Sequence, residues 1–586
     1  MYELRNERVT MGTLLVASID FGTTFSGWAF SFKHEFERDP GKVYAKQWTG
    51  SQIVSLKAPT CALIRPCGAV LEHFGYEAES RYSDLALEKL HGDWFYFKRF
   101  KMMLFNKMDL HRDTEIEDAM GKKLPARIVF SLCIKYLKDD AMKTINTRLT
   151  GDEIRENDIR WVLTVPAIWN DAAKQFMREA AEEAKIDGRN LLIALEPESA
   201  SLYCHHLPSE VSAGSVSTFQ PGTKYMILDA GGGTVDITVH QVAHNGGLVE
   251  LHKASGGAWG GTKVDEAYEK FLEEITGNNG VMTRFKEDNM ENYVDLMRDF
   301  EVKKREINPT AQCNFRLPSS LIEMIRDLTK KPLKDLIATS RYKDKLTILG
   351  DKLRLAGELA TSLFDLPIQS IIAHVTSLLE KPNVTDCHII VMVGGFSEAA
   401  ILQSRVKEAF PHVKVITPSD AGVAVLKGAV IFGHNPGAIA QRVLKLSYGQ
   451  EATHPFTEDC LKKHPKADRE RDDNGIVRCF NVVDIHARAG QAVTEGQLQS
   501  EQVYTPLYDD QHEMESAVLT SPLEDPQYVT DCTEIGKWTF PIKDAGKKGK
   551  EREFGVSFMF GGTEVKVKIV DKATGEIKEL RLNCLG

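Results

Sequence analysis

The sequence lacks the paired cysteines, the long apolar runs and the positive net charge that indicate metal-binding, disulfide-bonded, membrane-spanning or nucleic-acid-binding proteins. Its 10 cysteines are scattered, no CxxC pair occurs, and Cys61 and Cys67 are the closest two. Neither a zinc site nor a disulfide framework is therefore predicted, and thiols in a reducing compartment are expected. No apolar run reaches the roughly 18 residues that span a bilayer, and residues 14–19 are too short for a signal peptide. The net charge of −10 predicts no broad attraction to nucleic acid or anionic membrane. A cytoplasmic location is expected.

Residues 225–236 (YMILDAGGGTVD) carry the most informative pattern that is present. An apolar run typical of a buried strand is followed by Asp229, Gly231, Gly232, Gly233, Thr234 and Asp236. Glycine amides can approach an anion closely and converge on it, and the carboxylates suit a hydrated Mg²⁺ that bridges phosphates. The stretch predicts a phosphate and metal site, and a glycine-rich hairpin turn is the alternative.

The same arrangement occurs near the N-terminus. The apolar residues 14–19 (LLVASI) end in Asp20, which is followed by Gly22, Thr23, Thr24 and Phe25. A single loop of this kind is weak evidence, because short glycine motifs occur by chance. Two copies far apart in the chain predict duplicated lobes that face one nucleotide across a cleft.

Other segments have two interpretations each. Residues 94–105 (WFYFKRFKMMLF) fit an amphipathic core segment or a lysine delivered into the cleft, either Lys101 or Lys98. Glu196 after the strand at 191–195 fits an ordinary strand end or a carboxylate that orients a metal-bound water. The glycine cluster at residues 256–261 (GGAWGG) suggests backbone packed beside the terminal phosphate. Residues 300–305 (FEVKKR) fit a solvated helix face with an ion pair.

The order of elements predicts a large α/β region followed by a β region. At 586 residues, about two to four domains are expected. Apolar strands alternate with helices up to residue 433, which indicates α/β layering, and residues 353–364 are predicted to form a core helix. Residues 434–446 are predicted to be a connector and 461–475 an exposed loop. Alternation between residues 554 and 582 predicts a half-buried antiparallel sheet.

Taken together, the motifs resemble the seventy-kilodalton heat-shock proteins, within the actin, sugar-kinase and heat-shock ATPase superfamily. The motifs are IDFGTT, LTVPAIW, ALEPES, LDAGGGTVD, FEVKKR and VGGFSE, and the segments LSYGQ, IGKWTF and VKIVDKATGE resemble the family's β substrate-binding domain. The resemblance covers nearly the whole chain and is strongest to the divergent heat shock 70 kDa protein 12-like branch. It implies a two-lobed actin-like ATPase with duplicated ribonuclease-H-like lobes at residues 11–436 (lobe I about 11–221, lobe II about 222–436). A small antiparallel β-sandwich at 437–586 would follow, without a helical lid.

The resemblance also implies roles for individual residues. Asp20, Asp229 and Asp236 would hold Mg²⁺, mostly through water, and the catalytic set would be Lys101, Glu196, Asp229, Thr234 and Asp236. The residues expected to bind ATP or ADP are Gly22, Thr23, Thr24, Phe25, Gly231, Gly232, Gly233, Gly260, Gly261, Glu301, Lys304, Arg305, Gly394, Gly395 and Phe396. Under this reading residues 300–305 pack against adenosine instead of forming a solvated face.

The expected function is a slow ATPase of the chaperone type, with a role in the stress response, which couples nucleotide state to binding of extended polypeptide or a protein partner. A J-domain-type co-chaperone and a nucleotide exchange factor are the further partners implied. The alternative is a nucleotide-sensing adaptor with little turnover. The intact catalytic set favours the ATPase, the missing linker and lid favour the adaptor, and a third departure concerns only the preference for the nucleotide base. Phe396 and Glu398 stand where the family has a small polar residue and an arginine that stacks on adenine. The aliphatic, acidic-ended linker is missing, and no lid or acidic tail follows the last strand, so fast peptide exchange is expected. A sugar kinase is a distant third hypothesis.

Overall fold

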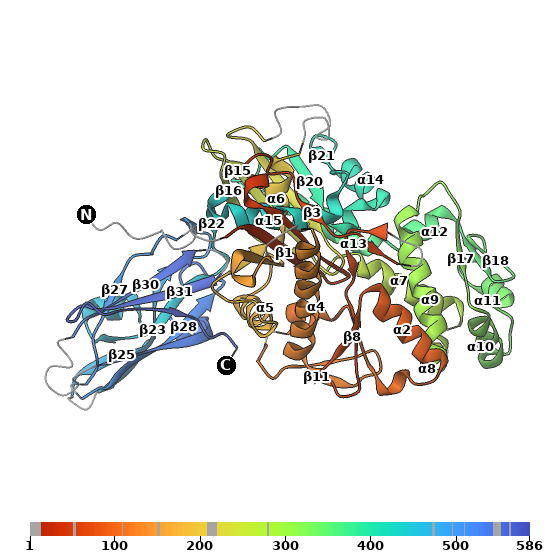
Figure 1. Cartoon of the computed structure of the whole chain (residues 1–586). Coiled ribbons are helices and arrows are strands. Elements are labelled where there is room, and N and C mark those ends of the chain that lie inside the picture. The colour runs from red at the N-terminus through yellow and green to blue at the C-terminus, as the bar shows by residue number, and fades with distance from the viewer. Residues whose placement is uncertain are drawn as a thin grey trace.

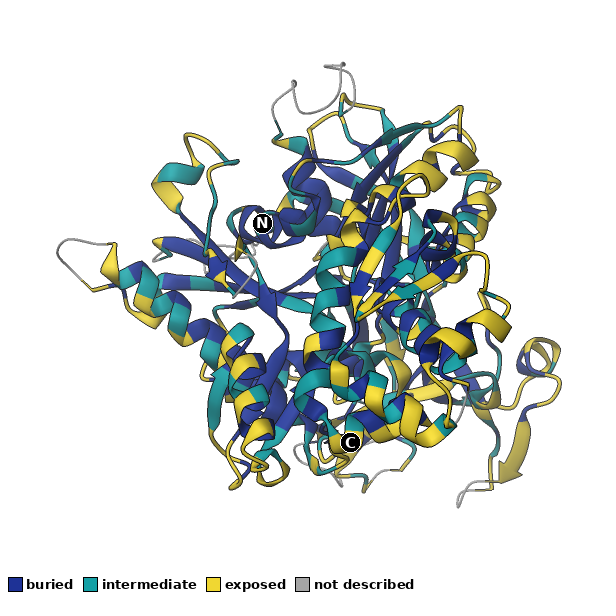
Figure 2. Ribbon diagram, turned by 90° about the vertical axis from the view of Figure 1, so that its right-hand side faces the viewer, coloured by how far each residue is buried: buried dark blue, intermediate teal, exposed yellow. Residues whose placement is uncertain are grey.

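The structure is a computed structural model that describes residues 13–50, 54–107, 109–148, 153–207, 219–277, 280–471, 475–494, 496–508, 510–542, 552–561 and 564–585. Two large sheets with helices around them form the bulk of the molecule, and the β region at its C-terminal end lies to one side of them (Figure 1). Buried residues concentrate in the central strands and the helices between them, while the outer faces of the peripheral helices are exposed (Figure 2).

The first sheet is built around β1 (Leu15–Phe21), whose residues are all buried. It pairs antiparallel with β2 (Phe25–Phe32) and parallel with β12 (Ile159–Val165), and β13 (Leu191–Leu195) extends the sheet beyond β12. The helices α4 (Ala126–Thr147) and α5 (Asp171–Glu183) contribute to one hydrophobic cluster with these strands. Because both faces are covered, the strands read as continuous apolar runs rather than alternating ones.

The second sheet repeats this plan. A hairpin of β14 (Lys224–Ala230) and β15 (Val235–Val242) stands at its centre, and β20 (Ile389–Val393) runs parallel to β14. The sheet continues through β21 (Lys414–Ile416) on one side and β16 (Leu248–Gly257) on the other. In both sheets a glycine- and threonine-containing turn joins the two central antiparallel strands, as expected from the sequence.

Two helices are packed between the sheets. The helix α15 (Ala424–His434) lies on the first sheet and on α6 (Glu196–His205), which in turn contacts β14 and β15. Their approach is close, since a Cβ added at Gly428 would lie 1.7 Å from the carbonyl oxygen of Ser199. This central layer fixes the relative position of the strand ends that carry the candidate site.

A second pair of contacts joins the outer parts of the two halves. The helix α2 (Tyr76–Leu87) connects β8 (Leu71–Phe74) to β9 (Phe95–Lys98), which form a three-stranded sheet with β7 (Cys61–Ile64). It packs against α9 (Met290–Lys303) from the second half. Further helices of the second half include α7 (Thr262–Ile275), α8 (Val281–Asp288), α10 (Ser319–Thr329), α11 (Leu333–Thr339) and α13 (Asp365–Leu379).

The C-terminal β region consists of a five-stranded and a four-stranded sheet. The first comprises β24 (Asp468–Arg471), β25 (Val477–Ala487), β23 (Ser447–Pro455), β28 (Glu513–Ser521) and β29 (Thr533–Pro541). The second comprises β27 (Gln502–Tyr504), β30 (Phe554–Gly561), β31 (Glu564–Asp571) and β32 (Ile577–Arg581). Side chains from both sheets, including Trp538, Phe540, Phe554 and Phe558, form one buried cluster, so the predicted half-buried antiparallel sheet is confirmed.

Three local predictions were wrong. Residues 353–364 are not one helix but β19 (Lys352–Leu355) followed by α12 (Gly357–Ser362), because Leu353 and Leu355 pair with β17 (Cys313–Arg316). The described part of the predicted loop 461–475 contains the end of α16 (Glu458–Lys463) and the exposed strand β24.

The third correction concerns the predicted connector, residues 434–446. It contains β22 (Ile439–Val443), which pairs parallel with β16 and antiparallel with β26 (Ala492–Thr494), so that both strands extend the second large sheet. The β region also contacts the first half directly, because Leu585 belongs to the hydrophobic cluster of the first sheet. Among the described residues, no helix has the length and apolar character needed to cross a membrane.

Candidate functional site

The two Asp-Gly-Thr loops meet at one cavity, whose empty volume, with the open solvent at its mouth included, is about 1150 Å³. A Cβ added at Gly232 would lie 2.1 Å from Oγ1 of Thr24, and one at Gly233 would lie 2.6 Å from Oγ1 of Thr23. The two loops therefore touch, and only glycine permits this approach. The cavity is lined by Asp20, Gly22, Thr23, Thr24, Phe25, Ser55, Lys57, Lys101, Glu196, Asp229, Gly231, Gly232, Gly233, Thr234, Gly261, Glu301, Lys304, Arg305, Phe364, Gly394, Gly395, Phe396, Glu398, Ala399, Gly422, Val423 and Val425.

Two of the predicted site residues are not in this lining. Gly260 lies behind the second loop, where its N–H donates to the carbonyl of Gly233 at 3.1 Å and an added Cβ would meet the Gly232 carbonyl oxygen at 2.4 Å. Asp236 is 1% exposed and accepts a hydrogen bond of 2.9 Å from the backbone N–H of Ile168. Both residues shape the loop from behind.

A buried lysine–carboxylate pair stands at the inner end of the cavity. Lys101, which is 2% exposed, donates to Glu196 Oε1 at 2.7 Å. Lys101 lies in the short helix η2 (Phe100–Met102), which follows β9 (Phe95–Lys98). The segment therefore packs in the hydrophobic core and also places one lysine in the cleft. Lys98, the other candidate, instead pairs with Glu79 at 3.3 Å, away from this cavity.

Lys57 was not identified from the sequence. Its Nζ lies 2.5 Å from Oδ2 of Asp20, whose Oδ1 accepts a hydrogen bond of 2.8 Å from Thr164. No sequence motif surrounds this lysine, so only the fold reveals its place in the site. Phe364, Ala399 and Gly422 were missed for the same reason, since each lies in an ordinary helix or turn sequence.

Burial and crowding perturb the pKa values of the carboxylates. Burial, and then the like charges of neighbouring carboxylates, raise the pKa of Asp229 well above its usual range. Burial raises the pKa of Glu196 to about 7, against the opposing effect of Lys101. Burial also acts on Asp20, but Lys57 and Lys101 outweigh it and lower the pKa of that carboxyl. Clustered carboxylates with raised pKa values are typical of functional sites.

This donor set fits a hydrated magnesium ion. Burial raises the pKa values of Asp229 and Asp236, and like charges add to the effect at Asp229, so a nearby divalent cation would stabilise the ionised form of both carboxylates. Within the described ranges, no three His, Cys, Asp or Glu side chains stand close enough together to hold a metal ion directly. Asp20, Asp229 and Asp236 would therefore hold Mg²⁺ through its own water shell, which that ion gives up reluctantly.

One part of the cavity lining is mostly apolar. Phe364, Phe396, Ala399, Val423 and Val425 line it, and the rings of Phe364 and Phe396 stack at 6.2 Å between centroids. The turn that carries Phe396 needs glycine at position 394, where φ is +85° and an added Cβ would lie 2.4 Å from Oδ1 of Asp229. Such a surface suits a planar ring system.

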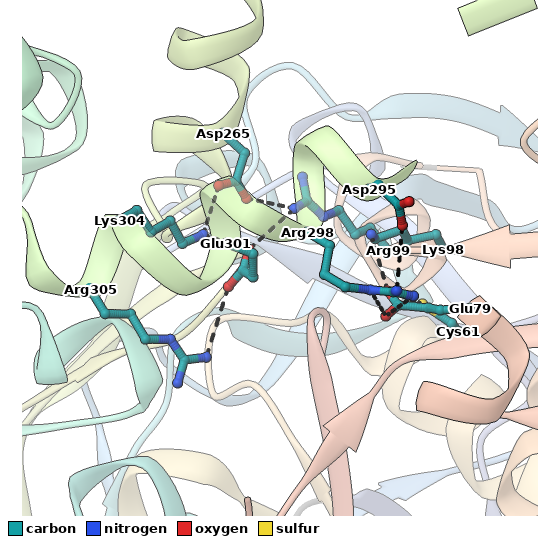
Figure 3. A network of polar contacts seen from close by, with 10 residues as sticks. All are labelled: Cys61, Glu79, Lys98, Arg99, Asp265, Asp295, Arg298, Glu301, Lys304 and Arg305. Atoms are coloured by element: carbon teal, nitrogen blue, oxygen red, sulfur yellow. Dashed lines mark hydrogen bonds and ion pairs between the residues drawn. The ribbon is translucent and has the colours of Figure 1, made fainter. Parts of the chain in front are cut away.

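Ion pairs across the mouth of the cleft join the two halves (Figure 3). Arg99, two residues before Lys101, lies 2.6 Å from Asp265 of α7 and 3.6 Å from Glu301 of α9. One turn earlier on α9, Arg298 lies 3.3 Å from Glu79 of α2. Lys304 also contacts Asp265 and Glu301, at 2.7 Å each. The predicted solvated helix face is thus a cross-cleft network at the edge of the cavity.

The strand β22 reaches the same site from behind. Arg442 donates through Nε and Nη2 to both oxygens of Glu198, at 2.7 and 2.8 Å, and Glu198 is two residues after Glu196 on α6. The N–H of Val443 donates to the buried Glu250 at 2.7 Å. Lys445 donates to the carbonyl of Ala167, next to the amide that binds Asp236. The segment between the α/β and β regions is therefore in polar contact with the backbone around the site.

Comparisons with known proteins agree with the motif content. The family model described as "Hsp70 protein" matches residues 89–453. The chain is 33% identical to human heat shock 70 kDa protein 12A over 631 aligned positions, which cover 98% of this chain and 92% of that protein. It is 34% identical to human heat shock 70 kDa protein 12B, covering 96% and 89%. Identity to a chaperone protein HscA homolog of Acinetobacter baumannii is 24%, over 59% of this chain and 48% of that protein.

Proposed function

The chain belongs to the Hsp70 family, and from that premise we propose that its cleft binds ATP with Mg²⁺ and hydrolyses it slowly. The observation that carries the proposal is the meeting of the two Asp-Gly-Thr loops with the Lys101–Glu196 pair in one cavity. The glycine loops offer backbone N–H groups to the phosphates, and Lys101 offers a positive charge where the transferred phosphoryl group gains negative charge. Phosphoryl transfer requires mainly this positioning and charge stabilisation.

Glu196 suits the role of orienting the attacking water. Because its pKa is about 7, this carboxyl can both accept and release a proton at neutral pH. Thr234 would contact the terminal phosphate, and Asp229 and Asp236 would hold the hydrated Mg²⁺, which supplies positive charge to the phosphate oxygens when bound. The hydrogen bond from Ile168 to Asp236 then fixes one of these carboxylates in place.

We further propose the domain arrangement of an actin-like ATPase at residues 11–436, with lobes at about 11–221 and 222–436, and a β-sandwich at 437–586. The β region would bind extended polypeptide segments by main-chain hydrogen bonds, or a specific protein partner. Its coupling to the cleft is supported by two contacts of the connecting segment. Arg442 of β22 binds Glu198 on the helix that carries Glu196, and Lys445 donates to the carbonyl of Ala167, next to the Ile168 amide that binds Asp236. A J-domain-type co-chaperone and a nucleotide exchange factor are the proposed helpers, and a cytoplasmic location and stress response the proposed setting.

Single-turnover hydrolysis of ATP, with protein in excess, tests the ATPase proposal. We expect slow hydrolysis by the wild type and a loss of about a hundredfold or more in Lys101→Ala, since a buried cation opposite the reacting phosphate is removed. The matched control is Lys98→Ala, which removes a nearby lysine that pairs with Glu79 outside the cavity and should leave the rate unchanged. Equal rates in wild type and Lys101→Ala would refute the assignment.

A second candidate function is a nucleotide-sensing adaptor with little turnover. The ion pair between Lys57 and Asp20 favours it, because a lysine on the first-loop carboxylate competes with the hydrated Mg²⁺ that hydrolysis requires. The adaptor predicts tight binding of ATP without hydrolysis in the same experiment, and no general preference for apolar peptides. Prevention of aggregation of several unrelated proteins would contradict it.

A further inference from the structure

The cavity contains one lysine to which the proposed hydrolysis assigns no role. Lys57 lines the cavity, and its side chain and that of its partner Asp20 are only 15% and 5% exposed. The other cations of the described cavity lining contact different carboxylates, and they are Lys101, Lys304 and Arg305. Lys57 is therefore the cation that stands directly on a carboxylate expected to hold Mg²⁺.

The sheet holds Lys57 in this place. The strand that follows it, β6 (Ala58–Pro59), pairs antiparallel with β2, which begins at the end of the first loop. A Cβ added at Gly27 of β2 would lie 3.1 Å from Cγ of Lys57, so the stem of the lysine packs on that strand. The pairing therefore fixes where this side chain begins and directs it along β2 toward Asp20.

The charge of Lys57 acts on the strand-end carboxylates of both loops. Burial raises the pKa of Asp20, and Lys57 makes the largest contribution in the opposite direction. Burial and neighbouring carboxylates raise the pKa of Asp229, whereas the charge of Lys57 lowers it. A bound cation would stabilise the same two carboxylates in their ionised form. Lys57 thus already supplies part of the positive charge that Mg²⁺ would bring.

We propose that Lys57 is a built-in cation that lets the cleft bind ADP or ATP without Mg²⁺. The inference rests on the proposed nucleotide site and concerns binding, which precedes hydrolysis. A lysine ammonium group is a compact charge with three donors, so it can hold Asp20 and a phosphate oxygen at the same time. Hydrolysis would still use Mg²⁺, which has to displace Lys57 from Asp20, and this displacement accounts for slow turnover.

The charges in the cavity decide how strongly binding depends on the metal. A diphosphate that enters among carboxylates is repelled unless a cation compensates the charges. If Mg²⁺ were the sole cation there, its removal would weaken binding strongly. Lys57 is part of the chain and stays when Mg²⁺ is removed, so the affinity for ADP should change little.

Isothermal titration with ADP, in excess Mg²⁺ and in EDTA, tests the inference without interference from hydrolysis. The dissociation constants of the wild type should agree within about threefold between the two conditions. Lys57→Met keeps an unbranched side chain and removes its charge. In EDTA it should bind ADP about tenfold or more weakly than the wild type, because a hydrogen bond between charged groups is lost. In Mg²⁺ it should stay within about threefold of the wild type, which also shows that the variant is folded.

The matched control is Lys46→Met. Lys46 also pairs with an aspartate of the first half, since its Nζ lies 2.7 Å from Asp140, and their side chains are 27% and 20% exposed. It lies outside the described lining of the cavity. This variant should bind ADP as the wild type does in both conditions.

Four outcomes are distinguishable. Binding of ADP by the wild type in EDTA, weakened there by Lys57→Met and restored by Mg²⁺, supports the inference. A wild type that loses about a hundredfold in EDTA overturns it while the nucleotide site stands. So does a Lys57→Met variant that matches the wild type in EDTA, or one that is weakened equally in both conditions. Failure of the wild type to bind ADP in either condition overturns both the inference and the proposed function.

Discussion

The ion pair between Arg442 and Glu198 gives the sharpest prediction about how the β region is held. The side chain of Glu198 is 3% exposed and that of Arg442 is 13% exposed, so the pair is almost fully withdrawn from water. Arg442→Ala would leave the Glu198 carboxylate buried without its bidentate partner. Breaking a buried pair in this way costs about 3–5 kcal/mol. Because Arg442 lies in β22, we expect the cost to appear as opening of that strand.

Hydrogen exchange measured by mass spectrometry on a peptide that covers residues 439–443 reports this opening. A cost of about 3–5 kcal/mol corresponds to exchange that is faster by about two to three and a half orders of magnitude, up to the limit of the unprotected chain. Protection in the hairpin of β14 and β15 should change much less. A second variant, Arg442→Ala with Glu198→Gln, should recover part of the protection, because the uncompensated charge is gone.

The matched control is Arg488→Ala. Arg488 lies 2.8 Å from Asp525, but their side chains are 52% and 56% exposed, and an exposed pair contributes at most about 1 kcal/mol. If Arg442→Ala changes exchange at 439–443 no more than Arg488→Ala does, β22 is not held by the buried pair. The coupling route proposed through Arg442 would then be refuted.

Two further predictions concern the same region and the cleft mouth. Burial raises the pKa of Glu250 from 4.5 to about 7, so the folded state binds this proton more tightly than the unfolded state, and protection of β22 should fall as pH rises from about 4.5 to about 7. Glu250→Gln should remove that slope in hydrogen exchange, and an identical slope in the variant would contradict the assignment. Arg99→Ala removes the cation that pairs with the buried Asp265 across the cleft, so fluorescent ADP should dissociate about tenfold faster in stopped flow. An unchanged rate, equal to that of Lys98→Ala, would show that this pair does not hold the cleft closed.

The sequence by itself determined the local chemistry of the candidate site. The runs around Asp20 and Asp229 predicted strands that end in glycine loops, and β1, β2, β14 and β15 confirm them. The prediction of these strands and loops succeeded for two reasons. A strand that is buried on both faces needs a continuous apolar run, and a loop whose backbone approaches another closely needs glycine. Both requirements are visible in a few consecutive residues. The family resemblance also placed Lys101 ahead of Lys98, which the hydrogen bond to Glu196 supports.

Only the tertiary structure decided which distant groups meet. Lys57 and Gly422 lie in sequences without a motif, and the fold alone brings them to the cavity. Residues 439–443 were predicted to be a connector because they contain few apolar residues. They form a strand because β22 is hydrogen-bonded to a neighbouring strand on each side, β16 and β26. The stripe at residues 353–364 was misread because Leu353 and Leu355 fit a helical period as well as a strand, and pairing with β17 settled the choice. Local sequence specifies which groups can act, whereas long-range pairing and burial decide which of them act together.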